Sequence, residues 1–173
     1  MRELAPFGAL PIMEVDGQIL SQTQALATFA GKLSNLYPED PWLAAKVDEA
    51  INGCTDVTGT VGATMRIEDE DEKLEARAKL MEPEGRLTLH LGGINKLLEA
   101  NGSNGATVGD ALTVADLAIW RLVGWLDGGT LDGIPPGWAT TTFPAIAALI
   151  AKVDTHEGVI SWKKSHPDFY PTL

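Results

Sequence analysis

The sequence has little cysteine, little positive charge and no long apolar run, and each shortage excludes a class of protein. Cys54 is the only cysteine among 173 residues, so the chain can form neither an intrachain disulfide nor a multi-cysteine metal site. Lysine and arginine number 13 against 24 aspartates and glutamates, which gives a net charge of −11. Because nucleic acids and anionic membrane surfaces attract basic patches, we expect neither as a partner.

The apolar content is that of a globular protein with one sizeable core. Hydrophobic residues make up 45% of the chain, and the mean hydropathy is +0.01. No apolar stretch is as long as the roughly 18 residues that a membrane-spanning helix needs. The first residues do not lead into the apolar segment of a signal peptide. We therefore expect a cytoplasmic protein. No metal site is expected, because the only three histidines lack ligand spacing: His90, His156 and His166.

The first informative pattern is a hairpin near the start of the chain. Residues Leu10 to Val15 are apolar-rich, and Gln18 to Leu20 return after the dipeptide Asp16-Gly17. Asp-Gly between two short apolar segments favours a type I′ turn. The pattern predicts an antiparallel hairpin, which is too small to bury both of its faces and needs neighbours.

A helix is expected directly after the hairpin. Ser21 followed by Gln24 fits a capping box, which would open a helix through Phe29. Gln22 and Thr23 lie at this start. A carboxylate there would meet side-chain donors, free backbone N–H groups and the positive end of the helix dipole.

Besides the helix start, the backbone of Leu10 could form a second binding group, because Pro11 follows it. A cis Leu10-Pro11 bond would turn the backbone N–H and C=O of Leu10 outward, as a pair that can bind an extended peptide. Taken singly, Pro11 is an ordinary edge-strand proline and Ser21 an ordinary cap. The ordered combination of hairpin, proline and helix start favours a binding element.

From Asp40 onward the pattern is helical. Asp40-Pro41 fits an N-cap followed by proline at the first helical position, ahead of an apolar stripe at spacings of three and four: Leu43, Val47, Ala50, Cys54, Val57 and Val61. The stripe predicts that Cys54 is a buried structural thiol. A further stripe comprises Leu87, Leu91, Ile94 and Leu98, and Pro83 before it predicts a kink or two separate helices.

The segment Leu112 to Leu117 contains a second motif. Thr113 fits an N-cap, while the Asp116 carboxylate can reach back to the Thr113 N–H. Leu112 and Leu117 fit the accompanying hydrophobic staple. We therefore expect Asp116 to stabilise the fold and to have no catalytic role.

These motifs resemble those of the cytosolic glutathione transferase family. The similar segments are Leu10-Pro11, Glu14-Val15-Asp16-Gly17, Gln22-Thr23-Gln24-Ala25-Leu26 and the Thr113/Asp116 box. The resemblance implies a mostly α fold, in which a partial thioredoxin-like β-β-α element (residues 1–34) precedes an all-helical C-terminal domain (residues 38–173). The first β-α-β part of the family's thioredoxin-like domain has no counterpart in this sequence.

The resemblance also implies a site for glutathione, an anionic tripeptide. Leu10, before Pro11, matches the residue whose backbone pairs with the cysteinyl part. Gln22 and Thr23 match the pair that holds the γ-glutamyl carboxylate, with Thr in place of the commoner Ser.

Two further residues match binding positions of the family. Asp56 matches a residue that reaches the γ-glutamyl amine across a dimer, and Arg2 is spaced like the basic residue on the glycyl carboxylate. No catalytic residue is assigned, because none of Tyr37, Tyr170 and Ser21 matches the Tyr, Ser or Cys with which the family stabilises the glutathione thiolate.

The expected function is a glutathione transferase, sigma-like in class, that in its complete form joins glutathione to small hydrophobic electrophiles. One alternative is a noncatalytic glutathione-transferase-like subunit or scaffold, and another is glutathione-dependent isomerase chemistry such as prostaglandin synthesis. The expected partners are a second copy in a homodimer, or a partner that covers the strand edge left open by the missing part. Three explanations of that gap compete: an incomplete version of an ordinary enzyme, a chain that pairs with a separate piece, or a binding subunit. The retained binding motifs favour the first.

Overall fold

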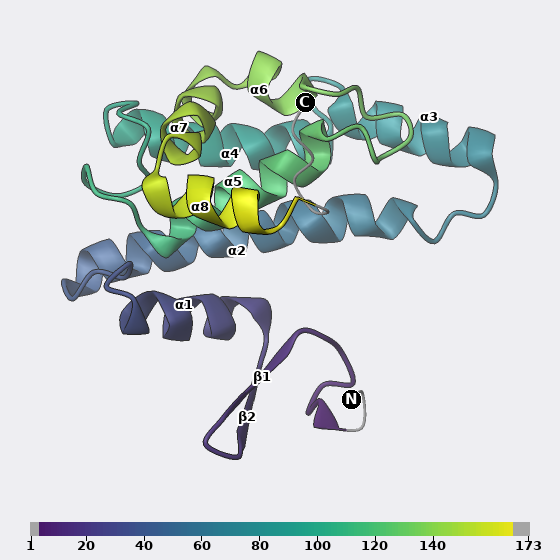
Figure 1. Ribbon diagram of the computed structural model, residues 1–173. Helices are drawn as coiled ribbons and strands as arrows, with labels where there is room; N and C mark the ends of the chain where they lie inside the picture. Colours follow the sequence, from purple (N-terminus) through teal and green to yellow (C-terminus); the bar gives the residue numbers. More distant parts are fainter. Residues whose placement is uncertain (1–3, 168–173) are drawn as a thin grey trace.

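A computed structural model describes residues 4–167, which form a two-stranded hairpin and eight helices (Figure 1). The hairpin and the first helix come first in the chain, and every later element is helical. This confirms the mostly α fold with a β-β-α element ahead of a helical region. The elements are β1 (Ile12–Val15), β2 (Gln18–Ser21), α1 (Thr23–Leu33), α2 (Pro41–Thr64), α3 (Glu70–Met81), α4 (Arg86–Ala100), α5 (Val114–Asp127), α6 (Trp138–Thr142), α7 (Pro144–Asp154) and α8 (Glu157–Ser165).

The hairpin has the predicted turn. β1 and β2 are antiparallel, with Ile12 opposite Ser21 at one end and Val15 opposite Gln18 at the other. Asp16 and Gly17 have φ angles of 50° and 76°. Positive φ at both central residues is the signature of a type I′ turn, whose twist matches that of the strands.

The start of α1 differs from the prediction. Ser21 is the last residue of β2, so its backbone stays extended and paired with Ile12. The chain turns into the helix one residue later: Gln22 occupies the N-cap position, with no capping hydrogen bond from its side chain. The predicted capping box of Ser21 and Gln24 is therefore wrong, because strand pairing takes precedence over the local capping preference.

The core lies among α2, α4, α5 and α7, and the predicted apolar stripes face it. The stripe of α2 is buried from Val47 to Val61, although Leu43 at the helix start is 39% exposed. The α3 helix ends before Pro83 and α4 begins after it, which confirms two separate helices. The largest fully buried side chains are Leu87, Leu91, Ile94, Leu98, Ile119, Leu126, Ile146, Leu149, Val47, Val57, Val61 and Val123. None of the helices between residues 4 and 167 is long and apolar enough to cross a membrane.

Asp116 holds the start of α5. Its side chain is fully buried, and one carboxylate oxygen accepts from the Thr113 N–H at 2.6 Å and the Thr113 hydroxyl at 2.9 Å. The other oxygen accepts from the Thr107 N–H at 2.6 Å and the Thr107 hydroxyl at 2.5 Å. The predicted capping box is confirmed. Its carboxylate also fixes the preceding loop, a contact that the sequence motif does not indicate.

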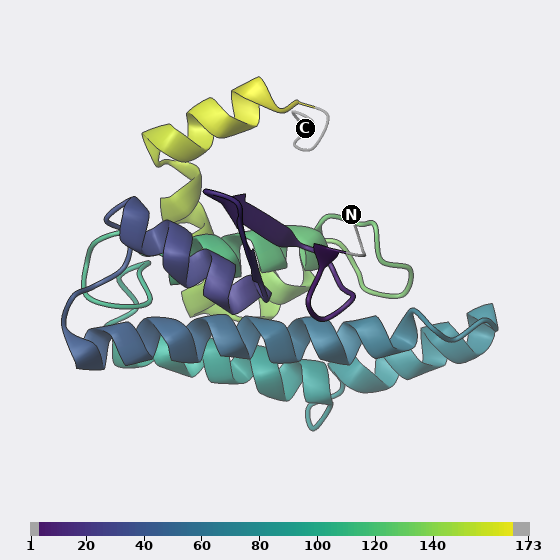
Figure 2. The same ribbon diagram turned by 90° about the horizontal axis from the view of Figure 1, so that it is seen from below.

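Helix α1 lies along α2 in both ribbon views (Figures 1 and 2). The Thr28 hydroxyl donates to the Asp48 carboxylate at 3.2 Å, and the Val114 N–H donates to the Leu36 carbonyl at 2.8 Å. Gly31 permits this packing, because a Cβ at that position would lie 2.9 Å from Cγ1 of Val114. These contacts attach the hairpin and α1 to the helical core.

Candidate functional site: a peptide-binding end of the hairpin

The structure brings two of the predicted binding pairs to the same end of the hairpin. Because Ile12 is paired with Ser21, Pro11 and Gln22 are the next residues beyond the last pair. The Leu10-Pro11 peptide bond is cis, and Leu10 is 53% exposed. The backbone around Leu10 and the start of α1 therefore lie at one exposed end.

Gln22 has an unusual backbone conformation. Its φ of 73° and ψ of 119° lie in a region that residues other than glycine rarely adopt. Such conformations cost about 1–3 kcal/mol and gather at functional sites. The Gln22 side chain is exposed, and Thr23, also exposed, is the first helical residue. The first-turn N–H groups of α1 have no acceptor within the helix, so this end of α1 suits a carboxylate.

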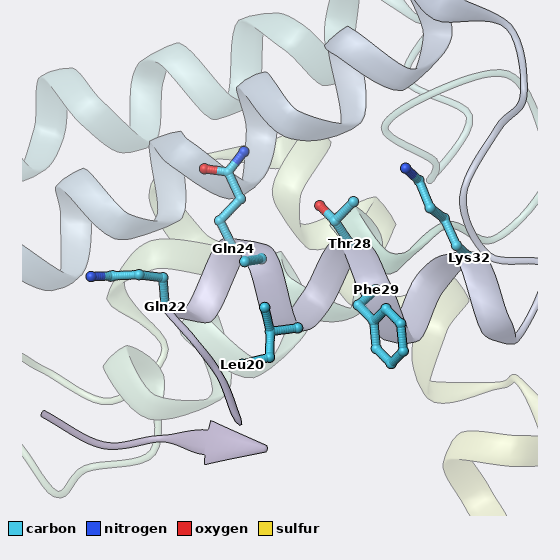
Figure 3. Close-up of a pocket in the computed structure, with 7 residues that line it drawn as sticks. Leu20, Gln22, Gln24, Thr28, Phe29 and Lys32 are labelled. Atoms are coloured by element: carbon cyan, nitrogen blue, oxygen red, sulfur yellow. The ribbon is translucent and has the colours of Figure 1, made fainter. Parts of the chain in front are cut away.

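A hollow of about 540 Å³ runs along α1 from Gln22 to Lys32 (Figure 3). Gln24, Thr28 and Lys32 project from one side of α1, whereas Phe29 and Leu20 lie on the other. Our sequence reasoning gave Gln22 a binding role but missed Gln24, Thr28 and Lys32. Their spacing of four, which places them on one helical stripe, is the signal that could have found them.

The remaining predicted residues do not join this end of the hairpin. Asp56 is exposed on α2 and lines a different hollow, of about 450 Å³, between α2 and α4. Glu49, Asn52 and His90 share that hollow. Arg2 lies outside the described residues. The predicted roles of both residues stay predictions.

Tyr37 and Cys54 both lie in surroundings that raise the pKa of the side chain. The Tyr37 hydroxyl donates to the Ala44 carbonyl at 3.4 Å, and burial, together with the neighbouring Asp48 carboxylate, raises its pKa above the ordinary value. Burial raises the pKa of the Cys54 thiol to about 12. The thiol is therefore neutral near pH 7, which agrees with the structural role expected for it.

The hairpin, the helix α1 that follows it and the helices from α2 onward define the class of proteins in which a partial thioredoxin-like β-β-α element precedes an all-helical region. A sequence model of the family described as "Glutathione S-transferase, C-terminal domain" matches residues 56–166. The chain belongs to the glutathione S-transferase family.

Individual relatives agree with this assignment. The probable glutathione S-transferase 7 of Caenorhabditis elegans is 28% identical over 165 residues, which cover 94% of this chain and 76% of the relative. Glutathione S-transferase 1 of Ascaris suum is 30% identical over 69% of this chain and 58% of its own length.

Solved structures show the same fold. A monomeric glutathione S-transferase of the hookworm Necator americanus is 28% identical, with a TM-score of 0.74 over 96% of this chain and 78% of that chain. Prostaglandin synthase D of Nilaparvata lugens has a TM-score of 0.78 over the same shares at 22% identity, a likeness of fold alone.

Proposed function

We propose that this chain binds glutathione at the exposed end of its hairpin. The Leu10 backbone, ahead of Pro11, pairs with the cysteinyl part of the tripeptide, while Gln22 and Thr23 receive the γ-glutamyl carboxylate at the start of α1. The observation that carries the proposal is the backbone conformation of Gln22. This residue has a φ of 73° at the N-cap position of α1, and it lies at the same end of the hairpin as the cis Leu10-Pro11 bond. An extended peptide with a terminal carboxylate is the ligand that this arrangement suits.

We infer that the protein transfers glutathione to small hydrophobic electrophiles. The glutathione thiol loses its proton to solvent or a base, and the thiolate sulfur then forms a bond to the electrophilic carbon. At a substituted carbon the bond to the leaving group breaks and its electron pair departs with that group as an anion. At an activated double bond the π electron pair moves onto the electrophile, which then takes up a proton. The electrophile lies beside α2, between the element of residues 1–34 and the helical domain of residues 38–173. No residue of this chain is assigned to stabilise the thiolate. The proposed location is the cytoplasm.

Two further residues belong to the proposed glutathione site. Arg2 contacts the glycyl carboxylate, and Asp56 reaches the γ-glutamyl amine of a second copy in a homodimer. The support for Asp56 is its exposure on the α2 surface, away from its own chain's hairpin end.

The test compares two glutamine substitutions in the same hairpin. Gln22→Ala removes the proposed carboxylate ligand, whereas Gln18→Ala removes an exposed glutamine at the opposite end of β2. Isothermal titration with glutathione should show about tenfold weaker binding for Gln22→Ala, the loss expected for a hydrogen bond to a charged group. Gln18→Ala should bind as the wild type does. Equal affinity in all three proteins would exclude Gln22 from the site.

A noncatalytic subunit is the second candidate function, and one observation favours it. Within residues 4–167, β1 pairs only with β2, so its outer edge is free to add a strand from a partner. A conjugation assay with a chromogenic electrophile separates the two candidates. Glutathione binding without turnover supports the subunit, while turnover supports the transferase.

A further inference from the structure

Helix α8 has little to hold it on the rest of the molecule. Val159 is its only buried residue. The Lys163 ammonium forms an ion pair with the Asp154 carboxylate of α7 at 3.0 Å, and it lies 5.8 Å from the centre of the Trp120 ring. The two side chains of the ion pair are 39% and 40% exposed, and exposed pairs contribute little to stability. Because a helix of nine residues is too short to be stable by itself, the order of α8 depends on its caps.

The start of α8 is capped by a histidine. The His156 Nδ1 atom accepts a hydrogen bond from the Gly158 N–H at 3.2 Å. Gly158 leaves room for the imidazole, because a Cβ at that position would crowd Nδ1 at 3.3 Å. Only an unprotonated nitrogen can accept a hydrogen bond, so the cap requires a neutral ring with its proton on Nε2.

Helices α2 and α3 are capped by aspartates instead. Asp40 accepts from two backbone N–H groups at the start of α2, and Asp69 accepts from one at the start of α3. An aspartate carboxylate ordinarily keeps its negative charge down to about pH 4, whereas histidine changes its charge between about pH 5 and 8. Of these three helices, only α8 has a cap that depends on pH near neutrality.

Protonation of His156 reverses its effect on α8. The imidazolium ring has an N–H on both nitrogens, so the Gly158 N–H loses its acceptor. The new positive charge also lies at the positive end of the helix dipole, where a cation is unfavourable. Both changes weaken the first turn of α8.

The charged groups around His156 do not compensate for the lost cap. Arg121 of α5 lines the same hollow as His156 and adds a charge of like sign. Glu157, in the first turn of α8, has the opposite charge, but it is exposed and its attraction is screened by water and salt. Asp154, at the end of α7, already accepts from the Lys163 ammonium.

The histidine at the other end of α8 has no such requirement. His166 occupies the C-cap position and stacks on the Trp162 ring, with ring centres 3.7 Å apart. Its Nδ1 atom lies 3.0 Å from the Trp162 carbonyl oxygen, so Nδ1 carries a proton in the neutral ring as well as in the charged one. A positive charge is favourable at the C-terminal end of a helix. His166 therefore serves as a matched control for His156.

We propose that α8 is a pH-sensitive element of the fold, which is ordered while His156 is neutral and loosened when His156 is protonated. Helix α8 forms one wall of a hollow of about 410 Å³, and the start of α5 forms another. Loosening of α8 opens this hollow as the pH falls from about 7.5 to about 5. The device is independent of the proposed glutathione site.

Amide hydrogen exchange at pH 7.5 and pH 5.0 tests the proposal. Protection factors are compared, because they correct for the pH dependence of intrinsic exchange. In the wild type the protection of the α8 amides should fall about fivefold at the lower pH, the factor expected for the loss of an N-cap. The protection of α3, a short helix capped by Asp69, should stay unchanged.

Two variants separate the two histidines of α8. His156→Asn supplies an N-cap acceptor that does not titrate in this range, so α8 should keep its protection at both pH values. His166→Gln should show the same fall as the wild type. The proposal is overturned if α3 and α8 lose protection alike, if the fall persists in His156→Asn, or if it disappears in His166→Gln.

Discussion

The hairpin with α1 and the helices from α2 onward bury their residues in different ways. Between residues 4 and 33 only Ala5 and Gly31 are buried, whereas α2 alone buries seven residues, including Val47 and Val61. The helices pack against one another, while α1 packs against them through a few contacts such as Thr28 with Asp48. The hairpin and α1 therefore depend on the helical core for their order, while they expose the groups that a ligand can reach.

Removing the Asp116 carboxylate should have the largest effect, because it acts inside the helical core. Asp116→Ala leaves four buried donors without their acceptor, and we expect the free energy of unfolding to fall by about 3 kcal/mol or more. Urea denaturation measures the loss. Asp110→Ala, at an exposed position in the same loop, is the control and should be near neutral. A small effect of Asp116→Ala would mean that the core does not rely on this cap.

Gly31→Val should let the hairpin and α1 unfold without the helices from α2 onward. The new side chain would meet Cγ1 of Val114 at 2.9 Å and Cβ of Tyr37 at 3.3 Å, and both of those groups are stiff. We expect a loss of about 2 kcal/mol, as for an overpacked interface. Hydrogen exchange should accelerate in β1, β2 and α1 while α4, α5 and α7 keep their protection. Uniform acceleration would show that the regions unfold as one unit. Gly62→Val, with open space around it, is the control.

Cys54 gives the helical core a pH dependence. Its pKa rises from 9.0 in ordinary surroundings to about 12 in the folded chain, so the neutral thiol favours folding below pH 9 and this stability is lost as the pH rises from 9 towards 12. Between pH 9.0 and about pH 10 the loss should be about 1 kcal/mol. The measurement is the free energy of unfolding of the wild type and of Cys54→Ala at each pH. As the pH rises above 9, the wild type should lose stability relative to Cys54→Ala. A constant difference would contradict the burial of the thiol.

Gly59→Ala should have the smallest effect and the opposite sign. Gly59 lies inside α2 on an exposed surface, with nothing within 4 Å of a Cβ placed there. Alanine favours the helix over glycine by about 0.5–1 kcal/mol, so the melting temperature should rise slightly. Destabilisation instead would indicate that this surface of α2 is covered by a partner.

Local patterns predicted much of the fold. Apolar periodicity located α2 and α4, Asp16-Gly17 located the turn, and the Thr113/Asp116 spacing located the start of α5. The failure at Ser21 has a tertiary cause, because pairing with Ile12 is a cross-strand contact that a capping rule does not contain.

Local patterns also located part of the candidate site, whereas contacts between distant residues could not be predicted. The sequence placed Leu10, Pro11, Gln22 and Thr23 by local motif and resemblance, and strand register then explains why they lie together. The hydrogen bond from the Thr28 hydroxyl, which lines the hollow along α1, to Asp48 could not be predicted, since the two residues lie 20 positions apart and meet only where α1 packs on α2. Such an assignment of partners exists only in three dimensions.

The type I′ turn has a practical consequence for labelling the molecule. Asp16 and Gly17 are exposed at the hairpin tip, with open space around Gly17, and the proposed ligand contacts lie at the other end of the strands. Exposed loop tips tolerate insertions better than paired segments do. A fluorophore or short affinity tag attached at this tip would therefore report on the hairpin from a position that interferes with neither the helical packing nor the ligand end.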